Sequence, residues 1–270
     1  MNGKLLKKKE NAFILQPRDM EILKTVSAFS FLNSGQVAEL CGFKCRKRAN
    51  DRLRKLFDNG LLSRRLLVTC SEKQLIYFAG PKAIDLIAGR TGACPDRVRK
   101  KRLKALKARD SFLLKFLTVN NFRCAFEISA LKGEPVRIEE FRYKPALFLD
   151  EETKLFPDAY FRFGYDGSSH NLFLTADRAA ESSKRIKKRI ENYLEYGISG
   201  ECEKQFGCRY FRLLIICQSA ARLKSILKMI ERVTDKSFCW LTVEKNISPE
   251  KILSRIWLRP NTEGSHSLIK

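Results

Sequence analysis

The stretch CGFKCRKRANDRLRKLFDNG, residues 41–60, decides the fold of the first part of the chain. Its apolar residues recur at helical spacing and therefore lie on one stripe of an α-helix: Cys45, Ala49, Leu53, Leu56 and Phe57. The remaining faces are left to seven Lys/Arg within residues 44–55, opposed only by Asp51. A charged helix face is most often merely solvated, but this density of one sign indicates a polyanionic partner.

The segment before this helix predicts two more. Residues 17–42 supply both, the first beginning at Pro17, because proline fits the first turn of a helix. The second begins at Asn33, which resembles a capping box together with Gln36. We therefore expect three short helices to be complete by residue 57.

The segment after the basic helix predicts a β-hairpin. Asn59-Gly60 ends the helix, since glycine accepts the left-handed conformation there. Residues 61–69 and 74–79 are apolar enough to form two strands joined by a short turn. Three helices followed by a two-stranded wing are the layout of a winged helix-turn-helix domain.

In such a domain the N-terminal part of the third helix enters the major groove of DNA, where Arg and Lys reach guanine and Asn reaches adenine. Residues farther along meet phosphates. We predict groove contacts from Arg46, Lys47, Asn50 and Arg54, and wing contacts from Arg64 and Arg65. The other candidates for DNA binding are Lys44, Arg48, Arg52, Arg99, Lys100 and Lys101. A winged helix that binds protein instead is the alternative.

The distribution of charge agrees with a DNA-binding N-terminal part. Residues 1–110 carry 26 Lys/Arg against 10 Asp/Glu, whereas the remainder carries 27 against 20. The excess positive charge is therefore concentrated beside the basic helix. No apolar run approaches the roughly 20 residues of a membrane span, and residues 1–10 lack the apolar core of a signal peptide, so we expect a cytoplasmic protein without membrane contact.

The nine cysteines suit a reducing compartment, because their number is odd and no CxxC pair occurs. Cys202 and Cys208 flank a loop containing glycine, so a metal or redox role is conceivable there. The chain has only two histidines, His170 and His266, and clusters no four-ligand set. We expect buried or incidental thiols rather than a zinc site, and no cofactor.

A basic segment connects the two halves of the chain. Residues 89–96 are turn-rich and predict a linker, and residues 97–117 predict one helix with eight Lys/Arg in its first 13 residues. Its seam positions follow the spacing of a packed helix: Leu103, Leu106, Asp110, Leu113 and Leu117. Two interpretations of this helix remain: it forms a dimer, or it is a connector that lies on the second domain. Its basic N-terminal end could in addition bind phosphates along a DNA backbone.

The second half alternates between strands and helices. Strands are predicted over four consecutive segments, 122–131, 135–143, 154–164 and 170–177, with a hairpin turn before the last. Two helices and two strands follow in alternation, at 179–196, 210–219, 221–233 and 238–244. This order resembles the restriction-endonuclease-like core.

Active nucleases of that core hold a divalent metal with an Asp on one strand and a (D/E)xK triplet on the next. Here Asp158 fits the first position, but the next strand offers Thr175-Ala176-Asp177. Thr replaces the first carboxylate and Asp replaces the Lys. A metal between Asp158 and Asp177, with Glu181 or Glu127 nearby, is the alternative. We expect instead that these carboxylates pair with Arg. We therefore name no catalytic residue.

These residues resemble the replication-relaxation (plasmid MobC-like) family of bacterial plasmids and integrative elements, over about residues 15–200. The family combines a winged helix with a domain whose signature is PDA, an apolar strand, then E-x-DR-x-x-E and a basic helix ending in Tyr. Matching residues are Asp158, Asp177, Arg178, Glu181 and Tyr193, as well as the wing sequence Leu75-Ile76-Tyr77. Thr175 stands where the family usually has Glu, and Arg189 where Lys is common. The resemblance implies a mobile-element DNA-binding factor.

Together these features predict an α+β protein in three parts: a winged helix at 1–90, a linker and basic connector helix at 91–120, and an α/β domain for dimerisation or partner binding at 121–270. The expected function is sequence-specific binding of double-stranded DNA by a non-enzymatic homodimer, in transcriptional regulation or mobile-element replication or transfer. The alternatives are a metal-dependent nuclease or nicking accessory, and a protein-interaction adaptor.

Overall fold

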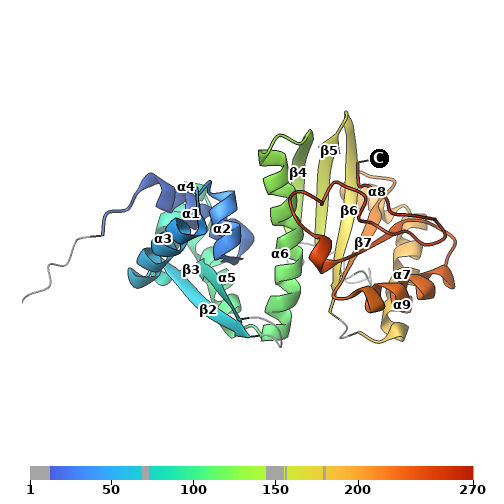
Figure 1. The fold of residues 1–270 in the computed structure, drawn as a ribbon, viewed down its shortest axis with the longest axis horizontal. Helices are drawn as coiled ribbons and strands as arrows, with labels where there is room; N and C mark the ends of the chain where they lie inside the picture. Colours follow the sequence, from blue (N-terminus) through green and yellow to red (C-terminus); the bar gives the residue numbers. More distant parts are fainter. Residues whose placement is uncertain (1–12, 69–72, 144–154, 156, 179–180, 270) are drawn as a thin grey trace, which may run out of the picture. The chain divides into compact units, whose positions relative to one another are not determined.

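The computed structural model describes residues 13–68, 73–143, 155, 157–178 and 181–269, with the side chain of Lys101 excepted (Figure 1). The chain forms two compact units that divide between Ala108 and Arg109. Helices and strands occur in both units, which confirms the predicted α+β class.

The described part of the first unit contains five α-helices and a small sheet. In chain order it contains α1 (Pro17–Phe29), β1 (Leu32–Asn33), α2 (Ser34–Leu40), α3 (Arg46–Asp58), β2 (Leu62–Val68), β3 (Lys73–Ala79), a 3-10 turn (Pro81–Ala83), α4 (Ile84–Thr91) and α5 (Pro95–Lys107). The strands form an antiparallel sheet in the order β1-β3-β2, with Leu62 opposite Ala79 and Val68 opposite Lys73.

The local signals at the ends of these helices act as the sequence predicts. Asn33 and Gln36 form the capping box of α2, and each side chain accepts the other's backbone N–H at 2.9 Å. Pro17 is the first residue of α1. Gly60 follows α3 with φ +73°, a conformation that glycine adopts without strain. These features set the lengths of the helices around α3.

One expected core residue lies elsewhere. Ala49, Leu53 and Leu56 are buried, as the apolar stripe predicts, and Phe57 is half-buried. Cys45 is exposed, because it precedes the first turn of α3 in an extended conformation instead of lying within the helix. The stripe therefore begins at Ala49.

The basic connector is two helices and not one. Residues 97–117 were predicted as a single helix since they contain neither Gly nor Pro. Ala108 and Arg109 are extended, with ψ 143° and 150°, so α5 ends and α6 (Asp110–Leu131) begins there. The seam residues predicted for one helix therefore lie on two. Leu103 and Leu106 each remain 43% exposed on α5, whereas Leu113 and Leu117 of α6 are buried in the second unit.

The remaining corrections concern neighbouring segments. Residues 89–96, predicted as a linker, contain the end of α4 and the start of α5 within the first unit. Residues 122–131, predicted as a strand, are the second half of α6. The apolar side chains of this half include Phe122, Ala125 and Phe126, whose spacing suits a helix that is buried over much of its surface.

The second unit is a sheet between two layers. It contains α6 and then β4 (Val136–Tyr143), β5 (Ala159–Tyr165), β6 (Ser168–Asp177), α7 (Ser183–Ile198), α8 (Glu201–Phe206), β7 (Arg212–Cys217), α9 (Ala220–Glu231), β8 (Cys239–Val243) and a 3-10 turn (Glu244–Asn246). The sheet order is β4-β5-β6-β7-β8, with β6, β7 and β8 parallel and the other pairs antiparallel.

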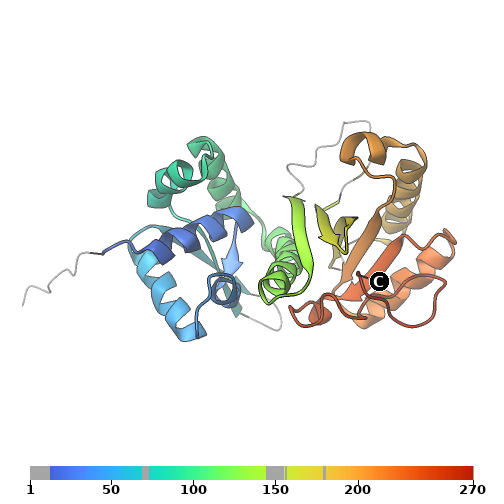
Figure 2. The same cartoon turned by 90° about the horizontal axis from the view of Figure 1, so that it is seen from above.

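Two cores cover the two faces of this sheet. On one face Phe122 and Phe126 of α6 pack with Trp257 of the C-terminal segment. On the other face α7, α8 and α9 supply the cover, including Ile190, Phe206 and Ile226 (Figures 1 and 2). This arrangement brings the carboxyl ends of β6, β7 and β8 and the start of β5 to the same edge of the sheet.

Candidate nucleic-acid interface and carboxylate cluster

The basic face of α3 consists of exposed polar side chains. They lie at the start of the helix and along its outer side: Lys44, Arg46, Lys47, Arg48, Asn50, Arg54 and Lys55. Among the described residues, no hydrogen bond or ion pair involves the side chains of Lys44, Lys47, Arg48 or Asn50. This face therefore presents charge and one amide to solvent, with the helix fixed behind it by the buried residues of α3.

Arg46 is placed by the preceding helix. Its Nε donates to Oγ of Ser34, the first residue of α2, at 3.2 Å. Arg54 lies one turn before Asp58 and approaches it at 3.8 Å, with both side chains mostly exposed. Such an exposed pair is worth little, so Arg54 stays available to another anion.

Arg52 differs from the other basic residues of α3. Its guanidinium makes a two-pronged ion pair with Asp19, whose side chain is fully buried in α1. It also donates to the backbone oxygen of Ile14 at 3.2 Å and lies over the ring of Phe13. The hydrogen bonds to Asp19 raise the pKa of Arg52. The structure thus gives Arg52 a structural role between α3 and α1, away from the candidate interface.

Arg64 and Arg65, the two arginines of β2, differ in their exposure and in their contacts. Arg64 is exposed and its guanidinium lies 4.0 Å from the ring centroid of Phe57. Arg65 is half-buried and donates from Nη1 to the backbone oxygen of Ala108 at 2.6 Å. A C-terminal helix end leaves carbonyls without partners, and Arg65 satisfies one at the end of α5. Of the two arginines of β2 that were predicted to contact DNA, Arg64 is therefore the one whose side chain stays exposed.

The basic helix α5 adds further exposed charge to the first unit. Lys100 is exposed, and Arg99 makes an exposed hydrogen-bonded ion pair with Asp96 at 2.6 Å. The side chain of Lys101 lies outside the described part of the structure. Because the pair between Arg99 and Asp96 is exposed, both Arg99 and Lys100 stay open to phosphate.

The second unit gathers the family-motif residues at the edge where β6, β7 and β8 end. We call the charged side chains there the carboxylate cluster: Asp158, Asp177, Glu181 and Glu244 together with Lys115, Arg178, Arg189 and Arg222. The cluster draws on α6, β6, α7 and α9 and on the residues next to β5, β6 and β8. Each of its four carboxylates is in contact with a Lys or Arg.

Asp177 is the most deeply buried carboxylate of the cluster, with 4% of its side chain exposed. Arg222 of α9 donates to it with two nitrogens, at 2.7 and 3.1 Å. The same guanidinium donates to the backbone oxygen of Glu181 at 2.7 Å. These contacts fasten the end of β6 to α9 and to the segment leading into α7.

Asp158 and Glu181 share one lysine. Asp158 Oδ2 accepts the backbone N–H of Ala176 at 2.9 Å and lies 3.1 Å from Lys115 Nζ. The same Nζ lies 3.8 Å from Glu181, which also accepts from Arg189 at 2.6 Å. Asp158 therefore ties the start of β5 to β6 and to α6.

Arg178 and Tyr193 complete the set of motif residues. Arg178 donates to Glu244 at 3.0 Å and to the hydroxyl of Thr118 at 3.3 Å. Tyr193 of α7 is fully buried, and burial raises the pKa of its phenol. Thr175 is also buried, and neither its hydroxyl nor that of Tyr193 has a hydrogen-bond partner among the described residues. Thr175 thus faces inward at the position where a nuclease would carry its carboxylate.

The donor set does not suit a divalent metal. Both oxygens of Asp177 are held by Arg222, and Asp158 is held by Lys115 and a backbone N–H. Glu127, another suggested ligand, pairs with Arg123 of its own helix at 2.7 Å. Within the described ranges, no group of three or more His, Cys, Asp or Glu is placed to hold a metal ion. The cluster as built is an ion-pair network.

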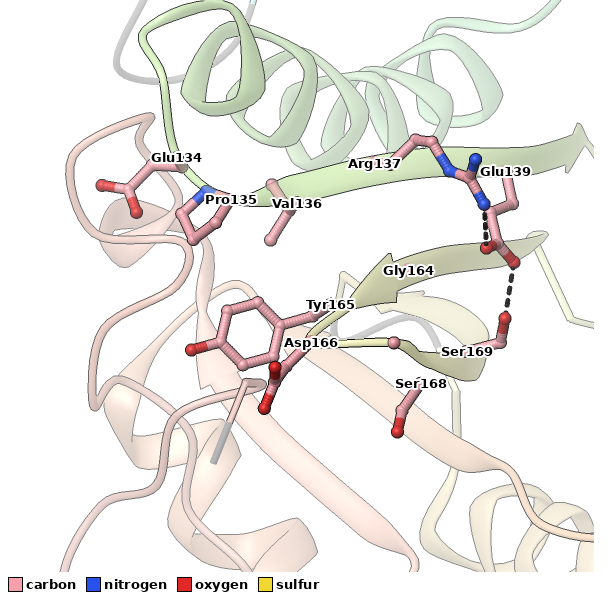
Figure 3. A pocket seen from close by; sticks show the side chains of 11 residues that line it. Glu134, Pro135, Val136, Arg137, Glu139, Gly164, Tyr165, Asp166, Ser168 and Ser169 are labelled. Atoms are coloured by element: carbon pink, nitrogen blue, oxygen red, sulfur yellow. Dashed lines mark hydrogen bonds and ion pairs between the residues drawn. The ribbon is translucent and has the colours of Figure 1, made fainter.

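Two surface hollows lie in the second unit. One of about 350 Å³ lies beside the β5–β6 hairpin, where the Glu139 carboxylate accepts from Arg137 and Ser169 (Figure 3). These three side chains of its lining are paired with one another. The other, of about 680 Å³, lies between α7, α8 and the start of β7. Neither contains a residue of the carboxylate cluster.

Three members of the cluster escape sequence analysis. Lys115, Arg222 and Glu244 come from segments far from the motif, and each meets its partner only through the tertiary fold. Lys115 and Thr118 are three residues apart on α6 and so lie on the same face of the helix. This spacing is the local feature of the sequence that could have indicated a polar site on that face.

Comparison with known proteins identifies the family. The model of the replication-relaxation family matches residues 23–208, more than two thirds of the chain. The chain therefore belongs to the replication-relaxation family, which points to a role in the replication or transfer of plasmids or other mobile elements. No curated protein matches the chain.

Among solved structures, the chain is similar to diamide-treated YodB from B. subtilis. The identity is 15%, the match covers 36% of this chain and 97% of that chain, and the TM-score is 0.23. Within the described residues, none of the helices combines the length and apolarity needed to cross a bilayer.

Proposed function

We propose that this protein is a non-enzymatic, sequence-specific binder of double-stranded DNA that acts in the replication or transfer of a mobile element, or regulates the associated genes. The observation that carries the proposal is the basic face of α3, on a helix that follows α2 across a short turn and precedes an antiparallel hairpin. That order is the one in which a recognition helix and a wing occur.

The division of labour within the proposal follows from exposure. Arg46, Lys47 and Asn50 lie near the start of α3, where a recognition helix meets base edges. Arg64 on the wing, with Arg99 and Lys100 on α5, would bind phosphates and fix the orientation on the duplex. We assign the carboxylate cluster to holding the second unit together, since its charges are already paired.

We further propose that the protein is a homodimer, because two leucines on α5 stay exposed. Leu103 and Leu106 are one helical turn apart on α5 and each remains 43% exposed. A second copy of α5 would cover such a pair. If the dimer binds a palindrome, the half-sites would be about one helical turn of DNA apart or a multiple of it.

The dimer has its own test. In sedimentation velocity, the Leu103→Ser/Leu106→Ser variant should dissociate at concentrations where the wild type remains dimeric. A Lys104→Ser variant, changed at an exposed position of the same helix, is the matched control and should keep the wild-type state. A monomeric wild-type protein would refute this part of the proposal.

DNA binding is tested by selection followed by measurement. Duplexes selected from a random library, and the DNA upstream of the protein's own gene, would be compared with scrambled duplexes by fluorescence anisotropy. The salt series should pass through roughly 150 mM, where non-specific binding is usually micromolar or weaker. Tight binding to one sequence alone is expected.

Other outcomes would favour the alternatives. Equal and steeply salt-sensitive binding to all duplexes would argue against sequence specificity, because a strongly basic protein binds any polyanion. Failure to bind any duplex would favour an adaptor with an acidic protein partner. Cleavage that requires magnesium and disappears in Asp158→Ala would establish the nuclease.

A further inference from the structure

Two cysteines of the second unit lie next to each other in the fold. Cys202 is in α8, and Cys208 is the second residue after the end of that helix. Their sulfur atoms are 3.4 Å apart. Both side chains are buried, with 1% and 8% exposed.

The backbone around this pair can change its conformation at low cost. Gly200 and Gly207 bracket α8, with φ +79° and +65°. A Cβ at Gly207 would meet no atom within 4 Å, so there is free space beside it. A disulfide needs a sulfur–sulfur distance of about 2.05 Å, so the two sulfurs would have to approach by more than an ångström. The bend at Gly207 lies between them and can supply that movement.

The two thiols are chemically unequal. The hydrogen bond between the two sulfurs lowers the pKa of Cys208 and raises that of Cys202. Arg162 adds a positive field that also lowers the pKa of Cys208. The thiolate is the reactive form of cysteine, so Cys208 is the nucleophile of the pair and Cys202 the neighbour that can resolve it.

A surface hollow reaches the Cys202 side of the pair. The hollow of about 680 Å³ between α7, α8 and β7 is lined in part by Cys202, Gly200 and Glu203. Cys208 is followed by Arg209 and Tyr210, which are both exposed. The pair is thus close to solvent although each sulfur is covered.

We propose that Cys202 and Cys208 form a reversible disulfide site that responds to small peroxides. The Cys208 sulfur attacks one peroxide oxygen, the O–O bond breaks, and the leaving hydroxide takes up a proton to become water. The Cys202 sulfur then attacks the resulting sulfenic acid, the S–O bond breaks, and the hydroxyl leaves as water with the Cys202 proton. Two thiols and one hydrogen peroxide give one disulfide and two waters.

The bond would join α8 to the segment that enters β7. Phe206 of α8 packs 4.3 Å from the ring of Tyr160, and Gln205 accepts from the hydroxyl of Tyr196 on α7. Oxidation would therefore fix α8 against the start of β7 and hold the cover of this sheet face in place. A dithiol reductant reverses it.

The test uses the full-length wild-type protein and graded hydrogen peroxide. Remaining thiols are alkylated, the protein is digested with trypsin without reduction, and peptides are mapped by mass spectrometry. Cleavage after Lys204 separates residues 190–204 from residues 205–209, so a disulfide appears as these two peptides linked and lighter by two hydrogen atoms. Treatment with dithiothreitol should restore both as free peptides.

The exposed cysteines Cys45 and Cys94 are internal controls, and so is the deeply buried Cys239. We expect the linked pair to form at a lower peroxide dose than oxidation of any of these three. Oxidation of Cys45 and Cys94 while the two peptides stay unlinked would overturn the proposal.

A variant tests the order of attack. In Cys202→Ala the resolving thiol is missing, so dimedone should trap a sulfenic acid on Cys208. Trapping in the converse variant, Cys208→Ala, should be much weaker at Cys202. Equal trapping in both would contradict Cys208 as the nucleophile.

Discussion

The basic face of α3 and the carboxylate cluster use the same kinds of side chain in opposite ways. On α3, Lys47 and Arg48 are exposed, as is Lys44 just before the helix, and none of the three meets an acid among the described residues. In the cluster, Arg222 and Lys115 are partly buried and each is paired with a carboxylate. Charge that is already paired stabilises its own fold, whereas exposed charge without a partner is free to bind a polyanion.

Arg52 shows that the distinction holds within one helix. It belongs to the basic run of residues 44–55, yet its guanidinium is held by buried Asp19. The number of Lys and Arg residues in a segment therefore overstates its exposed charge, and pairing with buried acids decides which side chains stay available.

The largest effect should come from breaking the buried pair of the second unit. Asp177→Ala leaves Arg222 without its carboxylate, and loss of one partner from a buried ion pair costs about 3–5 kcal/mol. Denaturant unfolding of the full chain should show this loss in the second unit. Asp235→Ala, at an exposed acid, is the control and should unfold like the wild type.

A second substitution tests whether Arg52 stabilises the fold in the way that the paired residues of the carboxylate cluster do. Arg52→Ala leaves the fully buried Asp19 unpaired, so the first unit should lose stability of the same order, about 3 kcal/mol. Lys55→Ala removes an exposed charge from the same helix and should change stability by less than about 0.5 kcal/mol. Similar unfolding curves for the two variants would remove the distinction.

The next effect concerns recognition and should leave stability alone. Arg46→Ala or Asn50→Ala should weaken binding to the selected duplex by about 1–3 kcal/mol and relax sequence preference at one position. Lys100→Ala should weaken all sequences alike and reduce the slope of log K against log salt by about one. Anisotropy titrations on selected and scrambled duplexes separate the two patterns. Equal losses on both duplexes for all three variants would contradict the division of labour.

The smallest effect is a pH dependence at His170. Burial lowers the pKa of this imidazole below its ordinary value, and its ring stacks on Phe163 at 4.8 Å. The folded state therefore binds the proton less readily than the unfolded state, so stability is full above about pH 6.5 and falls as the pH drops through the lowered folded pKa. His170→Gln should flatten the change in melting temperature between pH 7.5 and 5.5. An unchanged slope would rule out this group as the cause.

Local signals were sufficient where one segment determines its own structure. The capping box at Asn33, the helix end at Gly60 and the hairpin turn at Asp166-Gly167 each depend on backbone conformations that neighbouring residues dictate. The turn has positive φ at both residues, as a two-residue hairpin requires. The same signals were absent at Ala108, so the division between α5 and α6 was missed.

The sequence by itself determined the order of elements around α3, the α+β class and the membership in the replication-relaxation family, because spacing, capping and short motifs are local properties. Only the tertiary structure decided that α6 replaces the expected strand, that Arg52 turns inward, and that Lys115 and Arg222 neutralise Asp158 and Asp177. The physical reason is that burial and charge pairing depend on segments distant in sequence, and the chain brings these together only when it folds.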